Sequence, residues 1–184
     1  MKRVLSLLAI AVLLCGVAAL PAAAAPKTVD VTGFADEMLR LVNDERAKAG
    51  LAALGSASAL SAAAQKRAEE ITVRFDHKRP DGRGCFTALD DYGVSASHRG
   101  ENIALGYNAP AEAVAGWMNS SGHRKNILGD FDMLGVGVAV KNGRVYWVQL
   151  FIREGAKAPP AWKRWPPAVQ LFARVVLFGW IWMK

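Results

Sequence analysis

Three residues of this sequence have side chains suited to acid–base or metal chemistry: His77, Glu101 and His123. They lie 24 and 22 residues apart, and no HExxH, CxxC or Ser-elbow pattern connects them. If the fold brings them together, two imidazoles and one carboxylate would suit zinc or another divalent ion. The carboxylate could equally orient and charge one imidazole. Taken singly, Glu101 could instead accept backbone N–H groups in a tight loop, and His77 could simply end a helix.

The setting of His123 favours a cleft. It follows Ser-Ser-Gly in the stretch NSSGHRKNIL, residues 119–128, at the start of a predicted short helix. A buried structural histidine rarely needs such a setting. His98 and Glu112 have no comparable context, and we interpret them as surface residues.

Helices are predicted where apolar residues recur at steps of three and four. In the first helix these are Phe34, Met38, Leu41 and Val42, with Gly50 as its C-cap. The Arg79-Pro80-Asp81-Gly82 segment predicts a turn. The second predicted helix is capped by Ser56 or Ser58 and runs to about residue 75, with Leu60, Ala64, Ala68, Ile71 and Phe75 on its apolar face. The other predicted helices cover residues 34–49, about 85–92, a segment that starts at 108–110, and 123–128.

Two β-rich runs, 136–140 and 145–151, flank an Asn-Gly pair and predict a type I′ hairpin. Neither face of residues 135–140 is polar, because Gly135, Gly137 and Ala139 alternate with valines. A strand without a polar face is usually covered on both sides. We therefore expect an α+β protein with a sheet between helical layers. Residues 101–105 are a further short strand, and 93–100 are predicted to be a loop.

The two ends of the chain differ from the middle. Residues 1–24 resemble a signal peptide, with Lys2-Arg3 before an apolar run and Ala22-Ala23-Ala24 as the cleavage pattern. We therefore expect an extracellular or periplasmic protein. Residues 25–33 are a short leader. Residues 155–184 form a basic tail rich in Pro and Trp, and its 162–184 part is typical of peripheral contact with a membrane surface.

The net charge and the cysteine content exclude a nucleic-acid-binding protein and a domain held by an intrachain disulfide. The net charge is +7, but Lys2 and Arg3 contribute two of these charges and residues 157–184 contribute five. Residues 25–156 are therefore neutral, and the basic face that nucleic-acid binding requires is missing. After signal removal only Cys85 remains, so no intrachain disulfide can form. A small buried hydrophobe is the favoured interpretation of Cys85.

Several motifs together resemble one family. They are LVNDERAKAG, FDHKRPDGR, RGENIALG, GWMNSSGHRKNIL, MLGVGVAV and YWVQLF, in this order over residues 34–152. This set resembles bacterial members of the CAP superfamily, which includes cysteine-rich secretory proteins, antigen 5 and pathogenesis-related proteins. The resemblance implies an α-β-α sandwich of the CAP/SCP type, with a central and mainly antiparallel sheet, over residues 34–154.

The resemblance also implies a cleft where histidines and acids converge. His77 matches the first cleft histidine, Glu101 the acid of the GEN motif and His123 the second histidine, with Gly122 expected to permit the sharp turn before it. Many eukaryotic members carry a second glutamate where this sequence has Ser120, which weakens the case for a strong metal site. Asn126 is either a supporting cleft residue or a helix-packing residue.

Three functions remain open at this stage. The first is an exported binding or interaction module for a small ligand, a peptide, a lipid or a metal, and it is favoured because no nucleophile has a recognised activating context. The second is a metal-assisted extracytoplasmic hydrolase of peptides or phosphodiesters, with His77, His123 and Glu101 holding zinc or another divalent cation. The third is an envelope protein held at the membrane by its tail.

Overall fold

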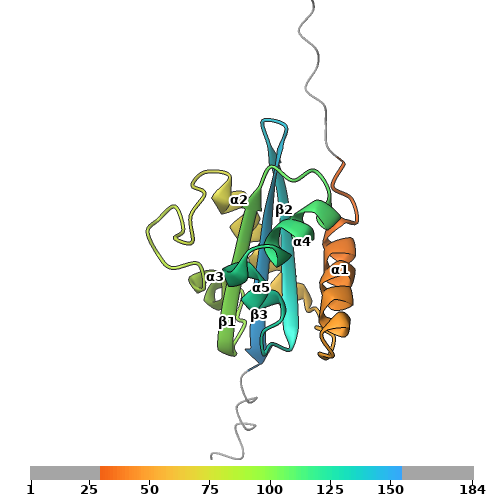
Figure 1. The fold of residues 1–184 in the computed structure, drawn as a ribbon. Coiled ribbons are helices and arrows are strands. Elements are labelled where there is room, and N and C mark those ends of the chain that lie inside the picture. Colours follow the sequence, from red (N-terminus) through yellow and green to blue (C-terminus); the bar gives the residue numbers. More distant parts are fainter. Residues whose placement is uncertain (1–29, 155–184) are drawn as a thin grey trace, which may run out of the picture.

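The computed structural model describes residues 30–154 (Figure 1). The predicted signal peptide, most of the leader and the tail from residue 155 onward lie outside the described residues. Within residues 30–154, no helix is both long enough and apolar enough to cross a membrane. The elements follow the order α1 Phe34–Lys48, α2 Ser58–Ile71, α3 Thr87–Asp91, β1 Ala96–Leu105, α4 Pro110–Met118, α5 Ser121–Ile127, β2 Met133–Lys141 and β3 Arg144–Glu154.

The first helix begins at Phe34 as predicted, whereas α2 begins at Ser58 with Ala57 as its N-cap, in place of a cap by Ser56 or Ser58, and it ends early. Gly50 follows α1 with a φ of 71°, as a C-cap glycine does. The apolar face predicted for α2 is buried up to Ile71, but Phe75 is 48% exposed because the helix has already ended. Two bonds explain this end: Asp76 accepts the Lys78 backbone N–H, and its carbonyl accepts a bond from Arg67. They hold the segment after α2 in a non-helical path.

The sheet is antiparallel throughout, in the order β1-β3-β2. The predicted hairpin turn is confirmed, since Asn142 and Gly143 both have positive φ, at 52° and 70°. The loop predicted for 93–100 is wrong from Ala96 onward, where β1 begins and pairs with the end of β3. Its first residues carry exposed polar side chains, so no apolar alternation marks them, and backbone pairing alone makes them a strand.

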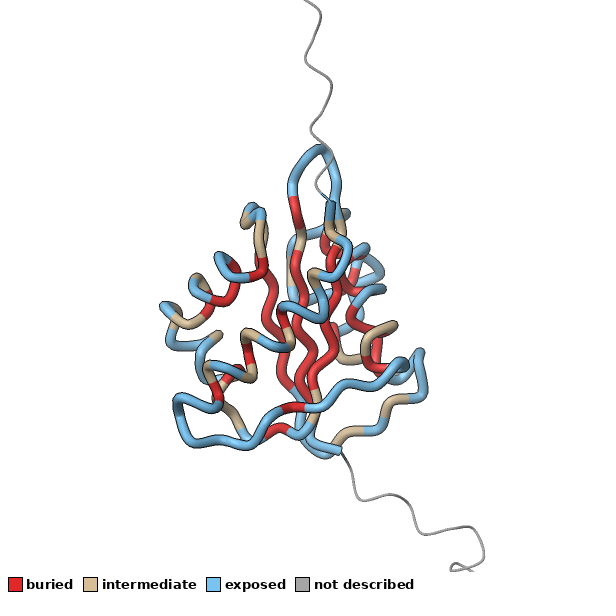
Figure 2. Tube along the Cα trace, turned by 90° about the vertical axis from the view of Figure 1, so that its right-hand side faces the viewer, coloured by how far each residue is buried: buried red, intermediate tan, exposed pale blue. Residues whose placement is uncertain are grey.

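Helices cover both faces of the sheet, which confirms the predicted α-β-α sandwich (Figure 2). Along β3, Trp147 and Phe151 face the layer of α1, α4 and α5, whereas Val148 and Leu150 face α2. The glycines of β2 explain the close packing of α2. A Cβ on Gly135 or Gly137 would collide with backbone atoms of α2, so α2 lies directly against this strand.

Candidate functional site

The candidate site lies at β1, which forms one edge of the sheet (Figure 1). Glu101 points from β1 toward α2, and its side chain is 1% exposed. His77, in the loop after α2, places Nδ1 2.7 Å from Glu101 Oε1. The structure therefore brings together two of the three residues that the sequence singled out. The bond leaves the Nε2 atom of His77 available, since the His77 side chain is 56% exposed.

The buried partner of this pair is Arg67, which sequence reasoning missed. Its side chain is fully buried, and its Nε donates to Glu101 Oε2 at 2.9 Å. Two further bonds reach Glu70 at 3.0 Å and the carbonyl of Asp76 at 2.9 Å. Arg67 thus fixes both the Glu101 carboxylate and the residue before His77. A signal existed in the sequence, because position 67 falls on the apolar stripe of α2 and an arginine there needs buried partners.

The ion pairs continue away from the site. Arg79 bonds Glu70 at 2.6 Å and Asp91 at 2.6 Å, although the sequence had assigned it only to a turn. The hydrogen bonds that Arg79 donates to Glu70 and Asp91 raise its pKa despite its burial. Burial raises the pKa of Glu70, but the hydrogen bonds from Arg79 and Arg67 outweigh burial and hold it below its usual value. His77 therefore ends a chain of alternating charges that reaches Asp91 and, beyond it, Arg83.

His123 lies in different surroundings. It stands on α5 at the end of a pocket of about 340 Å³ whose walls are mainly apolar. Burial lowers the pKa of His123, and the charge of His77 lowers it further. By contrast, the hydrogen bond to Glu101 raises the pKa of His77 against the effect of burial. The other pocket-lining residues are Phe75, Ile103, Ala104, Leu105, Tyr107, Gly116, Trp117 and Ser120.

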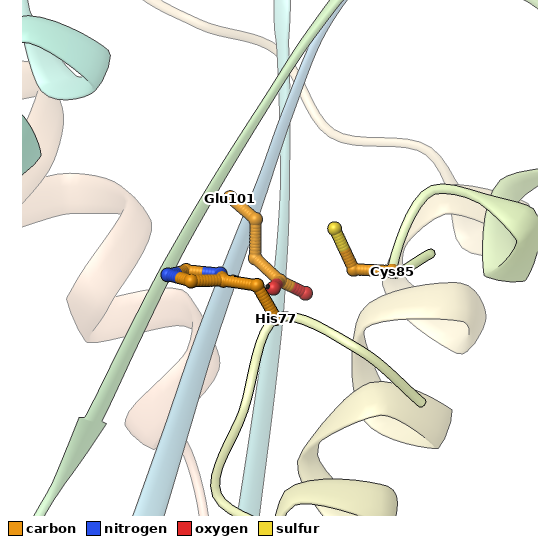
Figure 3. A group of neighbouring side chains, drawn as sticks. All are labelled: His77, Cys85 and Glu101. Carbon is orange, nitrogen blue, oxygen red and sulfur yellow. Dashed lines mark hydrogen bonds and ion pairs between the residues drawn. The ribbon is translucent and has the colours of Figure 1, made fainter. Parts of the chain in front are cut away.

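The pocket at His123 does not include His77. His77 borders a second hollow, of about 340 Å³, together with Cys85 and Arg99. Among the described residues, the three ligand-type side chains that cluster within 4.8 Å are His77, Cys85 and Glu101 (Figure 3). His123 is not part of this cluster. Cys85 is 7% exposed, and burial first and then Glu101 raise the pKa of its thiol to about 12.

The supporting residues hold α5 against the edge strand. Asn126 donates to the Glu101 carbonyl at 3.2 Å and to Asn102 Oδ1 at 2.8 Å. Asn102, which sequence reasoning missed, is fully buried and donates to the His123 carbonyl and to Gln149. Asn126 and Asn102 therefore set the position of His123 relative to Glu101.

The turn before His123 does not occur at Gly122, where the sequence predicted it. Gly122 lies inside α5, without the positive φ that would require glycine. The chain turns at Ser120 instead, which is the N-cap of α5 with extended backbone and makes no side-chain cap bond. The two residues interpreted as surface residues are exposed. His98 stacks on Phe131 with 5.0 Å between ring centroids, and Glu112 accepts the Asn108 N–H at 2.9 Å.

The sequence profile of the Cysteine-rich secretory protein family, CAP, matches residues 39–151. The chain belongs to the CAP family. It is 39% identical over 125 residues to the uncharacterised protein YkwD of Bacillus subtilis, covering 66% of this chain and 48% of YkwD. It is 36% identical over 120 residues to the uncharacterised membrane protein YlbC of the same organism, covering 64% of this chain and 34% of YlbC. This CAP chain thus spans less than half the length of either relative.

Solved structures share the fold. An extracellular SCP-domain protein of Bacillus anthracis superimposes with a TM-score of 0.62 at 31% identity, covering 67% of this chain and 41% of that chain. An outer surface protein of Borrelia burgdorferi superimposes with a TM-score of 0.63 at 19% identity, covering 71% of this chain and 100% of that chain. The second likeness shows the fold alone. Together they confirm the CAP/SCP architecture of residues 30–154.

Proposed function

We propose that this CAP protein is an exported ligand-binding module, and that its ligand has an apolar body and a polar end. The observation that carries the proposal is the pocket at His123. Its walls come from β1, α4 and the segment after α2, and its polar groups include Ser120, the N-cap of α5, and His123 in α5. A pocket with apolar walls and a few convergent polar groups is typical of small-molecule sites.

The polar end of the pocket is suited to hydrogen bonding. Because the pKa of His123 is lowered, its imidazole is neutral near pH 7 and offers one donor and one acceptor. The Ser120 hydroxyl makes no cap bond, so it is free to pair with a ligand. Phe75, 48% exposed, is the apolar residue most open to solvent in the pocket wall. Peptides with large apolar side chains and lipids with polar heads both fit this description.

The side chains also favour binding over covalent catalysis. Within residues 30–154, no serine, threonine or cysteine side chain is hydrogen-bonded to a histidine ring; His77 bonds Glu101. An activated nucleophile needs such a base within reach. The thiol of Cys85, whose pKa is raised to about 12, is protonated at neutral pH.

Export is supported by two observations. Residues 1–24 have the pattern of a signal peptide. The similar proteins of Bacillus anthracis and Borrelia burgdorferi are described as an extracellular protein and an outer surface protein. Secretion into the medium or retention at the envelope would leave the pocket open to extracellular ligands.

A thermal-shift screen of the full chain against peptides and lipids tests the binding proposal. A ligand at one hundred times its Kd should add about 2.7 kcal/mol to the free energy of unfolding. Ser120→Trp fills the pocket and should abolish that shift. Lys125→Trp, on the exposed side of the same helix, is the matched control and should keep it. Hits that survive equally in both variants would place the ligand elsewhere, and a screen without hits would contradict the proposal.

A metal-assisted hydrolase is the second candidate, supported by the His77–Glu101 bond. A carboxylate on one ring nitrogen orients the histidine and frees the other nitrogen for a metal. In this candidate, His77 Nε2 and His123 would hold the ion, and Glu101 would orient His77. When bound, it would polarise a carbonyl or phosphoryl oxygen. Turnover of peptides or phosphodiesters that is lost in His123→Ala would support this candidate, and no turnover with added zinc would exclude it.

A further inference from the structure

His77, Cys85 and Glu101 meet at one point although they come from three different segments (Figure 3). They stand in the loop after α2, just before α3 and on β1. One ligand atom from each, a nitrogen, a sulfur and an oxygen, lies within 4.8 Å of the other two. The cluster faces the Nδ1 side of His77, and Figure 3 shows the other ring nitrogen pointing away from Cys85.

This donor set is that of a zinc site. Zinc binds thiolate sulfur at about 2.3 Å and imidazole nitrogen or carboxylate oxygen at about 2.0–2.2 Å, in tetrahedral geometry. Those bond lengths place neighbouring ligand atoms roughly 3.5 Å apart. To admit the ion, His77 Nδ1 and Glu101 Oε1, now 2.7 Å apart, would have to separate by somewhat less than about 1 Å, and the Cys85 sulfur would complete the cluster. A fourth position would remain for water, because the His77 side chain is 56% exposed.

The charges around the cluster leave a place for a cation once Cys85 ionises. The buried groups balance, because two guanidinium groups, Arg67 and Arg79, face two carboxylates, Glu70 and Glu101. With His77 neutral, a Cys85 thiolate would add one negative charge, which a bound cation would offset. Arg67 Nε donates to Glu101 Oε2 at 2.9 Å, and Oε1 faces His77 and accepts a longer bond of 3.4 Å from Arg67 Nη2. Such a hydrogen bond to a ligating carboxylate is the usual support of a metal site.

We propose that His77 Nδ1, Cys85 Sγ and Glu101 Oε1 form a zinc-binding site. On binding, the Cys85 thiol loses its proton to solvent and forms a zinc–sulfur bond, without oxidation or reduction. A coordinated thiol is deprotonated outright, even where the free thiol is neutral. The site is independent of the apolar pocket proposed above, and it differs from an ion held by His77 Nε2 and His123 in using the other nitrogen of the His77 ring.

Cobalt substitution of the full chain tests the assignment. Cys15→Ser makes Cys85 the only thiol, and detergent keeps the apolar residues 4–20 in solution. Addition of Co²⁺ should produce the near-ultraviolet charge-transfer band of a cobalt–thiolate bond, and Zn²⁺ should remove it. Cys85→Ser should abolish the band, His77→Ala should weaken cobalt binding at least tenfold, and His123→Ala, the matched control, should leave both unchanged.

Two results would overturn the proposal. One is a Cys15→Ser chain without the band. The other is cobalt binding that is lost in His123→Ala and kept in Cys85→Ser, which would assign the ion to the Nε2 side. X-ray absorption of the zinc-loaded Cys15→Ser chain needs no substitution at the site. It should show one sulfur at about 2.3 Å, and a shell of nitrogen and oxygen alone would refute the site even if the Cys85 variant failed to fold.

Discussion

The two histidines of this CAP domain stand in opposite surroundings on either side of the edge strand β1. His77 lies on the side of α2, where ion pairs connect Glu101, Arg67 and Glu70. His123 lies on α5, at the end of an apolar pocket. The hydrogen bond to Glu101 raises the pKa of His77, whereas burial lowers the pKa of His123.

This difference means that the two imidazoles are not interchangeable. The hydrogen bond to Glu101 orients His77 and favours its charged form. His123 favours its neutral form and lines an apolar pocket. Two titratable groups whose pKa values are pushed apart can take different roles at the same pH. We call the pocket at His123 the apolar side and the group of His77, Glu101, Arg67 and Glu70 the ion-paired side. In a binding module, the apolar side would supply contact area for the ligand, and the ion-paired side would supply a rigid, charged surface beside it.

The largest expected loss of stability comes from replacing Arg67, which removes its ion pairs with Glu101 and Glu70. Arg67→Met leaves the carboxylates of Glu101 and Glu70 buried beside an apolar side chain. Removal of one partner of a buried ion pair costs about 3–5 kcal/mol. Urea unfolding should show a loss of that size. Arg83→Ala removes a guanidinium that is half exposed and should change stability by no more than about 0.5 kcal/mol. Equal losses of unfolding free energy in the two variants would contradict the proposed role of Arg67 as the main support of the buried carboxylates.

The contact between α2 and β2 should be the next most sensitive. In Gly137→Ala, the new methyl group collides with the Ala64 backbone, so α2 has to move away from the sheet and carry Arg67 with it. Overpacking of this kind costs about 1–3 kcal/mol. Gly84→Ala meets nothing within 4 Å and is the matched control. In Gly137→Ala, NMR chemical shifts should change more at His77 than at His123. The reverse order would show that α2 does not position His77 and Glu101.

The elements of the fold follow largely from local rules, and the sequence therefore predicted most of them. The hairpin depends on Asn142-Gly143, and α4 begins at Pro110, as its sequence indicated. The absence of a polar face on β2 correctly predicted cover on both sides. The early end of α2 and the long strand β1 were missed, because both depend on bonds to distant residues rather than on a local pattern.

The site was predicted only in part for the same reason. The family resemblance singled out His77, Glu101 and His123, but no spacing shows that Arg67 inserts between Glu101 and Glu70. Those contacts span 34 residues in one direction and three in the other. Cys85 was interpreted as a small buried residue, which its 7% exposure fits, yet its nearness to Glu101 depends on the turn at 79–82 and on β1 together.

The pKa difference between the histidines can be measured by NMR titration of the metal-free protein. His77 should titrate above His123, and Glu101→Gln should lower the value of His77 because the bond that raises it is weakened. A raised pKa stabilises the fold below the unfolded value, about 6.5, and this stabilisation disappears as pH rises through the folded value. His77→Ala should therefore destabilise the protein near pH 5 more than near pH 8. Coincident titrations would remove the contrast between the two sides.

The smallest effect should distinguish two hydroxyls, one on each side. Ser120 is the N-cap of α5 and makes no cap bond, so Ser120→Ala should cost less than the roughly 1 kcal/mol typical of a lost cap. On the ion-paired side, Thr87 accepts a bond from Arg79 at 3.1 Å. Thr87→Ala should therefore cost about 1.5 kcal/mol or more, as for bonds to charged groups.

The two values should be compared by urea unfolding under the same conditions. A loss in Ser120→Ala as large as that in Thr87→Ala would mean that the Ser120 hydroxyl already has a partner within the protein. It would then be unavailable to a ligand, and the polar end of the pocket would consist of His123 alone. A small loss would instead leave a hydroxyl and a neutral imidazole together at the start of α5, both without a protein partner until a ligand arrives. The apolar side would then be the binding side, and the ion-paired side its support.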